Sequence, residues 1–195
     1  MLCPLHADAG TGGNLSIIEL GLELVWIAPG TFTMGSANSG FDNQRPVTQV
    51  EISRGFWLGK TEVTQAQWQA VMGNNPSNFK GGALPVEQVS WTEAMEFCRK
   101  MTERERAAAR LPADLAYTLP TEAQWEYACR AGTTGDYSGE LKSMGWYNQN
   151  SGNITHPVGQ MQANAWGLFD MHGNVWEWCR DWYGLYPGGL VTDPT

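Results

Sequence analysis

The sequence predicts a mixed α+β domain in which ordered loops take up much of the chain. Alternating apolar residues indicate short strands in the first third, and three capping signals further along indicate helices. The 195 residues include 23 glycines, ten prolines and ten tryptophans, a composition typical of large rings packed against irregular backbone. Long regular helices are therefore not expected to dominate.

Two stretches of alternating sequence predict the strands. Residues 22–36, LELVWIAPGTFTMGS, are broken at Pro29-Gly30, which indicates two strands joined by a tight turn. Residues 47–64, VTQVEISRGFWLGKTEVT, continue in the same style. Strands are therefore expected before the helices begin.

Three helices are predicted from one start signal, a Ser or Thr followed three residues later by Glu or Gln. The pairs are Thr64 with Gln67, Ser90 with Glu93, and Thr121 with Gln124. Apolar residues then recur at helical spacing and predict one buried face for each of the last two helices. These residues are Ala94, Phe97, Cys98 and Met101, followed by Trp125, Ala128 and Cys129, with Gly132 placed to end the third helix.

Charge and hydropathy exclude some classes of function. The net charge is −8, so the surface repels phosphate backbones, and the basic residues of 99–110 are interrupted by Glu103 and Glu105 as on a solvated helix face. The stretch 103–116 lacks an apolar period and contains Pro112, so we expect a surface excursion there. A nucleic-acid partner is therefore not expected. A membrane span is not expected either, because no apolar run approaches about eighteen residues.

The cysteines and the N-terminus indicate a reducing compartment. Cys3, Cys98, Cys129 and Cys179 form no C-x-x-C pair, and the two in apolar helical stripes are interpreted as buried free thiols rather than a disulfide or reactive thiols. The start MLCPLHADAGTGG has neither a basic nor an apolar signal region. A cytoplasmic protein is expected, with a longer secreted precursor as the alternative.

Six blocks of sequence carry a resemblance to a known family. They are PGTFTMGS (29–36), KTEVTQAQW (60–68), PVEQVSWTEAMEFC (85–98), LPTEAQWEYACRAG (119–132), THPVGQ (155–160) and NAWGLFDMHGNVWEWCRDWYG (164–184). In order and spacing they resemble the sulfatase-modifying-factor domain of formylglycine-generating enzymes. The resemblance implies a family domain over residues 22–195 behind an N-terminal extension, residues 1–21. It also implies a loop-rich variant of the C-type-lectin fold.

Family members include oxidases that convert a sulfatase cysteine to formylglycine with copper, and non-catalytic members that display binding surfaces. In the oxidases, a segment after the TDP element carries the cysteine pair that binds copper. This sequence ends at TDPT, and its four cysteines match the body of the fold. Copper is therefore expected only if a further C-terminal segment supplies the thiolates, and the chain as given is not expected to be an active oxidase.

The resemblance also implies calcium, a hard cation that takes six to eight oxygen ligands. The first site would use the carbonyls of Asp170, Gly173 and Val175 and the carboxylate of Glu177. A second would fall at Asn148, Gln149, Asn150 and Gly152, where Asn150 replaces a frequent carboxylate, and an ordinary polar loop is the competing interpretation. By resemblance, one of the two tryptophans on either side of Glu177, Trp176 and Trp178, is expected to enter the core, and the other, which we assign to Trp176, lines the substrate groove of the family.

Other common sites find little support. His6, His156 and His172 show no metal-binding spacing, and His156 is expected to make a structural hydrogen bond. No serine lies in a nucleophile elbow, and Glu122 and Glu126 are interpreted as a solvated helix face rather than an acid/base pair.

Two hypotheses about function remain. The first is a calcium-stabilised binding or scaffold module for a protein or peptide, without an oxidase site. The second is the N-terminal part of a copper-dependent formylglycine-generating oxidase. Without the family's last strands, an exposed sheet edge and an apolar groove beside Trp176 would favour self-association or a complementing chain, unless residues 14–20, NLSIIEL, supply a strand.

Overall fold

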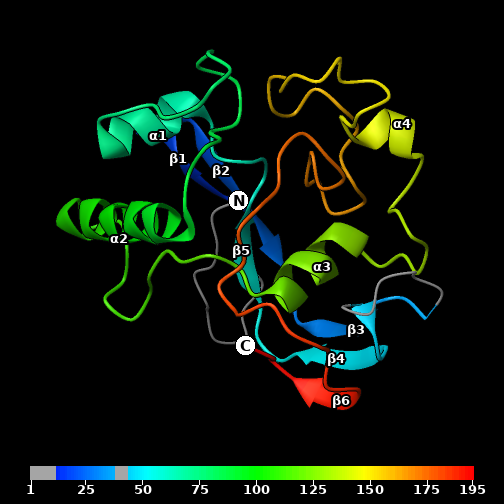
Figure 1. The fold of residues 1–195 in the computed structure, drawn as a ribbon. Coiled ribbons are helices and arrows are strands. Elements are labelled where there is room, and N and C mark those ends of the chain that lie inside the picture. Colours follow the sequence, from blue (N-terminus) through cyan, green and yellow to red (C-terminus); the bar gives the residue numbers. More distant parts are fainter. Residues whose placement is uncertain (1–11, 38–43) are drawn as a thin grey trace.

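Two separate three-stranded sheets and four helices build the domain in the computed structural model, which describes residues 12–37 and 44–195 (Figure 1). The elements follow the predicted order of strands before helices, apart from one late strand. They are β1 (Leu15–Ile17), the 3-10 helix η1 (Ile18–Leu20), β2 (Leu22–Ile27), β3 (Gly30–Met34), β4 (Thr48–Ile52), β5 (Phe56–Gly59), α1 (Gln65–Met72), α2 (Trp91–Ala107), α3 (Glu122–Arg130), α4 (Leu141–Met144) and β6 (Gly189–Thr192).

The sheets are paired differently from the order of strands along the chain. In the first sheet β2 lies between β1 and β5 and is antiparallel to both, and in the second β4 lies between antiparallel β3 and parallel β6. The predicted strands on either side of Pro29-Gly30 are both present. They do not pair with each other, however, because the turn carries the chain from one sheet to the other.

All three predicted capping boxes are confirmed. The side chains of Thr64, Ser90 and Thr121 each accept a hydrogen bond from the third helical amide, and the Gln or Glu side chain at that position accepts one from the backbone amide of the cap residue. Two orphan amides are thereby satisfied at each helix start. At the other end of α3, Ala131 and Gly132 both take left-handed conformations, with φ of 46° and 85°, so the helix stops just before Gly132.

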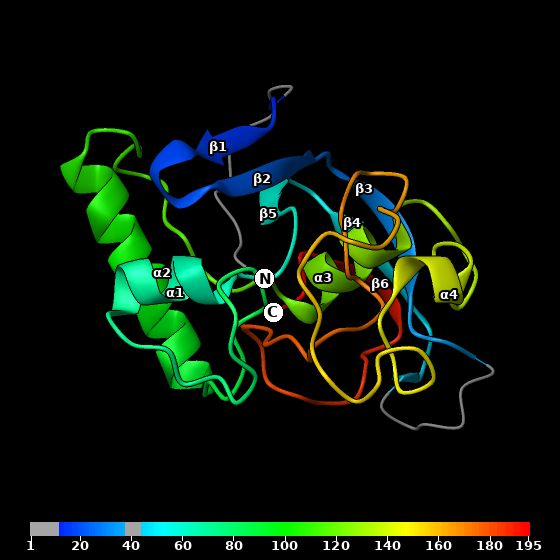
Figure 2. The ribbon, with the colours of Figure 1, turned by 90° about the horizontal axis from the view of Figure 1, so that it is seen from above.

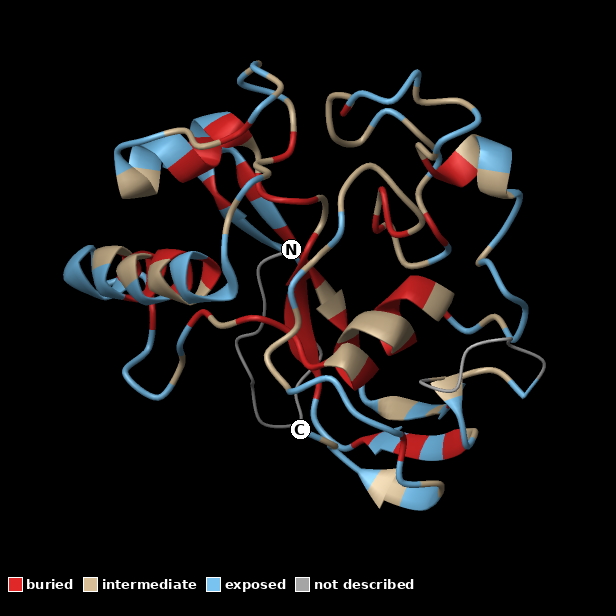
Figure 3. Cartoon of the chain, in the orientation of Figure 1, coloured by how far each residue is buried: buried red, intermediate tan, exposed pale blue. Residues whose placement is uncertain are grey.

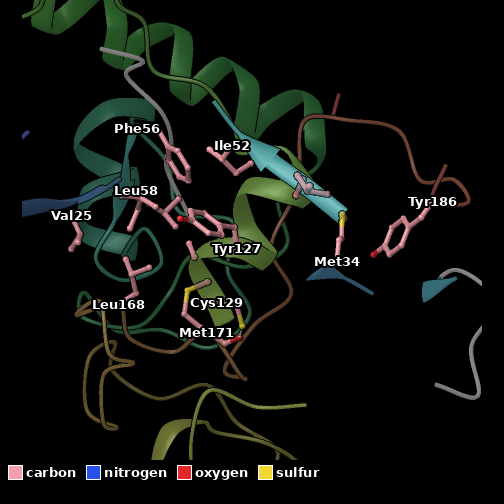
Figure 4. Close-up of a cluster of buried hydrophobic side chains, with 14 residues drawn as sticks. Val25, Met34, Ile52, Phe56, Leu58, Tyr127, Cys129, Leu168, Met171 and Tyr186 are labelled. Atoms are coloured by element: carbon pink, nitrogen blue, oxygen red, sulfur yellow. Dashed lines mark hydrogen bonds between the residues drawn. The ribbon is translucent and has the colours of Figure 1, made fainter. Parts of the chain in front are cut away.

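The core consists of two adjoining clusters of buried side chains. In the first, Phe56 and Leu58 of β5 pack with Ile52 of β4, Ala128 of α3 and Leu168 from the loop that follows (Figure 4). In the second, helices α1 and α2 cover the first sheet, and the rings of Trp68 and Phe97 stack with centroids 5.2 Å apart. The predicted buried face of α2 is confirmed, since Ala94, Phe97, Cys98 and Met101 all belong to this cluster.

The end of α2 corrects the expected solvated face. Glu105 is 2% exposed, and its carboxylate accepts two hydrogen bonds from the Arg110 guanidinium, at 2.7 and 2.8 Å. This pair folds the stretch after the helix back against it, which a charge pattern alone does not reveal. The helix itself ends at Ala107, where the apolar period stops.

Part of the expected N-terminal extension belongs to the first sheet. Residues 15–17 form β1 and pair with β2, Ile17 is buried, and the indole of Trp57 donates a hydrogen bond to the Gly13 carbonyl at 2.8 Å. The sheet therefore continues across the boundary expected at residues 21 and 22. The strand hypothesised within 14–20 is present as β1, while residues 1–11 lie outside the described part of the chain.

The cap at the start of α2 can be tested by substitution. Ser90→Ala removes the side-chain acceptor for the Glu93 amide and is expected to lower the free energy of unfolding by about 1 kcal/mol in urea denaturation. Thr92→Ala is the matched control, because Thr92 is exposed in the same helical turn and alanine favours a helix interior. Equal losses in the two variants would contradict a specific capping role.

Candidate functional site

The segment from Asp170 to Glu177 is a tight turn held by backbone hydrogen bonds. The Gly173 amide donates to the Asp170 carbonyl and the Val175 amide donates to the Gly173 carbonyl, while Asp170 and Asn174 take left-handed conformations. A side chain at position 173 would lie 2.1 Å from the Trp146 carbonyl oxygen. Only glycine fits there, so the close approach to residue 146 fixes the shape of the turn.

A cluster of carboxylates lies behind this turn. Asp170 is 1% exposed and Glu62 is 2% exposed. One Asp170 oxygen, Oδ2, accepts a 2.6 Å hydrogen bond from the Gly159 amide. Within the described residues, the other Asp170 oxygen and both Glu62 oxygens have no hydrogen-bond partner.

The surroundings of the cluster disfavour negative charge on its two buried carboxyls. Burial raises the pKa of the Glu62 carboxyl well above its usual range, and the charges of Asp170 and Glu177 raise it further. Burial also raises the pKa of Asp170, against a smaller opposing effect of the Gly159 hydrogen bond. Burial and like charge each penalise the charged form of a buried acid, so these carboxyls favour either a bound proton or a cation beside them.

Three separate elements position these carboxylates. Glu62 lies between β5 and α1, and the neighbouring Lys60 carbonyl accepts a hydrogen bond from the Phe169 amide at 2.9 Å. Glu177 accepts a hydrogen bond from the indole of Trp125 on α3 at 3.2 Å. The end of the first sheet, helix α3 and the 170–177 turn are thereby joined around one acidic site.

This arrangement fits a hard cation. The partnerless Asp170 and Glu62 oxygens are the ligands that calcium prefers, and the Asp170 and Gly173 carbonyls each have a second lone pair beside the amide they accept. Among residues 12–37 and 44–195, no three His, Cys, Asp or Glu side chains are arranged to hold a metal ion by themselves. A calcium site here therefore depends on carbonyl oxygens, and the predicted ligands Asp170, Gly173, Val175 and Glu177 lie within one turn.

The second predicted calcium position is a loop with a self-contained hydrogen-bond network. The Asn150 side chain accepts from the Tyr147 amide at 2.7 Å and donates to the Gly145 carbonyl at 2.9 Å. Asn148, Gln149 and Gly152 are exposed in the same loop. Asn150 thus closes the turn after α4, and its role as a metal ligand stays a prediction.

The tryptophans beside the turn are not divided between core and surface as predicted. Residues 176–179 lie outside any strand, Trp176 is fully exposed at 102%, and Trp178 is 47% exposed. Neither ring enters the core, so the expectation that one of them is buried is wrong. Side chains two residues apart in a strand would in any case share one face. Instead the Trp178 indole donates to the Val89 carbonyl, while the Trp91 indole donates to the Cys179 carbonyl.

Trp176 lies at the rim of a small cavity. The cavity has a volume of about 60 Å³ and is lined by Val86, Val89, Phe97, Trp176 and Trp178, with Glu62 and Glu177 as its acidic residues. Beyond it, the exposed segment continues through Trp182, Tyr183 and Leu185 (Figure 3). A larger cavity of about 210 Å³ beside β4 and the start of α3, lined in part by Arg54 and Arg180, contains none of the predicted site residues.

The cysteines are structural in the described part of the chain. Cys98 and Cys129 are buried free thiols, as predicted, and Cys179 is also free, whereas Cys3 lies outside the described residues. Burial raises the pKa of each of the three described thiols to about 12. None of them is therefore a thiolate near neutral pH, the form that copper(I) would need.

The two described histidines are also structural, and one pairing was not predicted, whereas His6 lies outside the described residues. His156 stacks on Trp146 with centroids 3.7 Å apart and contacts the Ser151 carbonyl at 2.8 Å, which confirms the expected structural bond. His172 bonds to Ser138, and the Cys129 sulfur lies 3.7 Å from its Nδ1. Burial lowers the pKa of His172, so this is a neutral, packed group.

Sequence reasoning missed Glu62, the most unusual residue of the site. It lies in the short loop between β5 and the cap Thr64, a position where an isolated acid normally faces solvent. Glu122 and Glu126 were also misjudged as solvated. Glu122 accepts from the Tyr186 hydroxyl and Glu126 from the Gly35 amide.

No helix in the described ranges is long and apolar enough to cross a membrane.

Comparison with known proteins finds one matching family and several related sequences. Residues 19–192 match the family described as sulfatase-modifying factor enzyme 1-like domain. The chaperone protein LppX of Paenibacillus barcinonensis is 33% identical, over 89% of this chain and 75% of that protein. The formylglycine-generating enzyme of Mycobacterium tuberculosis is also 33% identical, but the match covers 68% of this chain and 44% of that enzyme.

Solved structures share the fold. Treponema denticola variable protein 1 matches with a TM-score of 0.80 and 33% identity, over 92% of this chain and 80% of that chain. PvdO from Pseudomonas aeruginosa matches with a TM-score of 0.75 at 23% identity, over 89% of this chain and 76% of that chain, which bears on the fold alone. These matches confirm the predicted loop-rich α+β fold of the formylglycine-generating-enzyme type.

Proposed function

The chain belongs to the sulfatase-modifying factor enzyme 1-like domain family, and on this premise we propose that it is a calcium-stabilised module that binds another protein or peptide. The observation that carries the proposal is the fully exposed Trp176 at the rim of the cavity, next to Trp178. Exposed aromatic rings grouped over a hollow are typical of protein-binding surfaces. The relative LppX, which is named a chaperone protein, favours the same class of partner.

Calcium would act in this proposal as a structural clamp. The carbonyls of Asp170, Gly173 and Val175 and the Glu177 carboxylate would hold the ion, and the turn that they form leads directly into the aromatic segment. A bound ion would neutralise part of the buried negative charge and fix the backbone at Trp176. Such fixing lowers the conformational entropy that a partner must remove on binding.

A second candidate function is that of a formylglycine-generating oxidase, and the identity to the mycobacterial enzyme favours it. In that case copper would be held by cysteines supplied outside residues 12–37 and 44–195. The raised pKa values of Cys98, Cys129 and Cys179 make these three thiols poor copper ligands. The binding module is therefore the function that we favour.

The calcium clamp predicts a shift in thermal stability. A ligand that binds only the native state raises the melting temperature by mass action, so calcium is expected to raise it and a chelator to reverse the rise. Glu177→Gln should remove most of the rise, whereas Glu140→Gln, the same change at an exposed acid on the start of α4, should preserve it. Melting curves that do not respond to calcium in the unchanged protein would refute the clamp.

The binding surface can be tested with a displayed peptide library, from which ligands are selected on the purified protein. Trp176→Ala should weaken the binding of selected peptides at least tenfold, as removal of a central aromatic residue does. Leu190→Ala is the matched control, a largely exposed apolar residue on β6. Both variants should keep the unfolding free energy of the parent, and equal peptide affinities would count against this surface.

The oxidase alternative is separated from the module by a direct assay. The purified chain is incubated with copper, oxygen and a sulfatase-type cysteine peptide, and the product is followed by mass spectrometry. No conversion of cysteine to formylglycine is expected, because the three described thiols are buried or protonated. Turnover above a control with a copper chelator would favour the oxidase instead.

A further inference from the structure

The cavity of about 210 Å³ lies between the end of β4 and the start of α3, away from the predicted calcium turn. Arg54 and Arg180 line it from two separate segments. Arg54 follows β4 and is exposed, whereas Arg180 follows Cys179 and is half-buried. A guanidinium group has five N–H donors and keeps its charge in proteins. The wall of the cavity therefore carries two permanent positive charges.

Both guanidinium groups lack a partner. In residues 12–37 and 44–195, the side chains of Arg54 and Arg180 form neither a hydrogen bond nor an ion pair. Five other arginines form ion pairs or donate to carbonyl oxygens, namely Arg99, Arg104, Arg106, Arg110 and Arg130. Acids outnumber bases in this chain, which has a net charge of −8. Two unpaired arginines at one cavity are therefore available to an external anion.

Two buried polar side chains at the start of α3 add donors to the wall. Thr121 is 3% exposed, Gln124 is 7% exposed, and both line the cavity. Each side-chain oxygen accepts the other residue's backbone amide in the capping box. Within the described residues, nothing accepts the Thr121 hydroxyl hydrogen or the side-chain N–H groups of Gln124. Both side chains can therefore donate to a ligand, and the positive end of the α3 dipole favours an anion there.

The acids near the cavity already have donors. Asp193 lines the cavity and is exposed, and its two oxygens accept hydrogen bonds from the backbone amide and the hydroxyl of Ser53. The Asp181 carboxylate accepts from the Glu122 amide at 2.8 Å. Asp193 is the one acidic side chain in the lining, so the two guanidinium groups outnumber it.

The backbone on both sides of the cavity is anchored. The Ser53 amide donates to Asp193 at 2.8 Å directly before Arg54. The Arg180 amide donates to the Pro120 carbonyl at 2.7 Å, which holds this residue beside the start of α3. Anchoring of this kind lowers the conformational entropy that a ligand must remove on binding.

We propose that this cavity is a binding site for an oxyanion, a phosphate or carboxylate group held between the guanidinium groups of Arg54 and Arg180. A planar guanidinium can donate two parallel hydrogen bonds to either group. Thr121 and Gln124 would supply further donors from the α3 side. The site is independent of the calcium clamp and of the Trp176 surface, because no residue of either lines this cavity.

Titration with inorganic phosphate and with succinate tests the site on the purified chain. Each anion is compared with sodium chloride at the same ionic strength, in buffer without calcium, which phosphate would precipitate. At least one of the two anions should raise the melting temperature, as a ligand of the native state does, and should show saturable binding in calorimetry. Tighter binding of phosphate would identify a phosphate group as the ligand, and tighter binding of succinate a carboxylate group.

Substitutions locate the anion. Arg54→Gln and Arg180→Gln each remove one charged donor and are expected to weaken the affinity for the tighter anion by roughly 10- to 100-fold. Lys142→Gln is the matched control, because it removes one positive charge from an exposed residue of α4, and it should leave the affinity unchanged. If Arg180→Gln fails to fold, Arg180→Lys keeps the charge without the planar fork, and a fall in affinity is again expected.

Two results would overturn the proposal. The first is a parent protein whose melting temperature and titration heat respond to neither anion beyond the chloride control. The second is an equal loss of affinity in Arg54→Gln, Arg180→Gln and Lys142→Gln, because such a loss would reflect the overall charge of the protein rather than this cavity. Failure of the calcium clamp or of the peptide surface would change neither result.

Discussion

The need to satisfy buried backbone groups without regular secondary structure constrains the second half of this domain. Between residues 133 and 188, all of which are described, α4 is the sole regular element. Hydrogen bonds from side chains replace the backbone hydrogen bonds that a helix or sheet would provide. The Asn164 amide oxygen accepts from the Trp166 and Leu168 amides while its nitrogen donates to the Ala128 carbonyl, and Asn174 bonds to both backbone groups of His156. Buried loops of this kind persist only when each polar group finds a partner. The carboxylate oxygens of Glu62 and Asp170 that have no hydrogen-bond partner among the described residues are therefore exceptional.

The same loops bring the functional elements together. The turn at Asp170 connects a fully packed residue, Leu168, to an entirely exposed one, Trp176. The close contact of Gly173 with the Trp146 carbonyl fixes the turn from one side. Helix α3 holds it from the other through Trp125 and Glu177. Figure 2, the view from above, shows how the loops after α3 and the red C-terminal segment wrap around this helix. Packing and acidity are therefore concentrated in one place, where a bound ion and an exposed surface would influence each other.

The sequence predicts the features that depend on neighbours along the chain. Capping boxes, the buried face of α2 and the strands expected before the helices all follow from spacings of a few residues, and each is confirmed, whereas β6 was not predicted. Features that depend on distant partners were missed or misjudged. The break at Pro29-Gly30 marks a turn but cannot tell that β2 pairs with β5 and β3 with β4. Glu62 and Glu105 look like surface acids until the fold buries them. One of Trp176 and Trp178 was expected in the core, but both lie exposed in a segment that is not a strand. The family resemblance supplied the turn residues, but their role as metal ligands rests on the experiments above.

The pairing of β4 with β6 also determines when the domain can be completed during synthesis. Thr48 lies opposite Gly189 in a parallel register, so one edge of the central strand waits for residues that leave the ribosome much later. Closing so long a loop costs entropy before any contact repays it, and such distant pairings slow folding. A nascent chain that has delivered α1, α2 and α3 still presents the free edge of β4 to its surroundings. The nascent chain is therefore most exposed to aggregation, and most in need of a chaperone, between the emergence of α3 and that of β6.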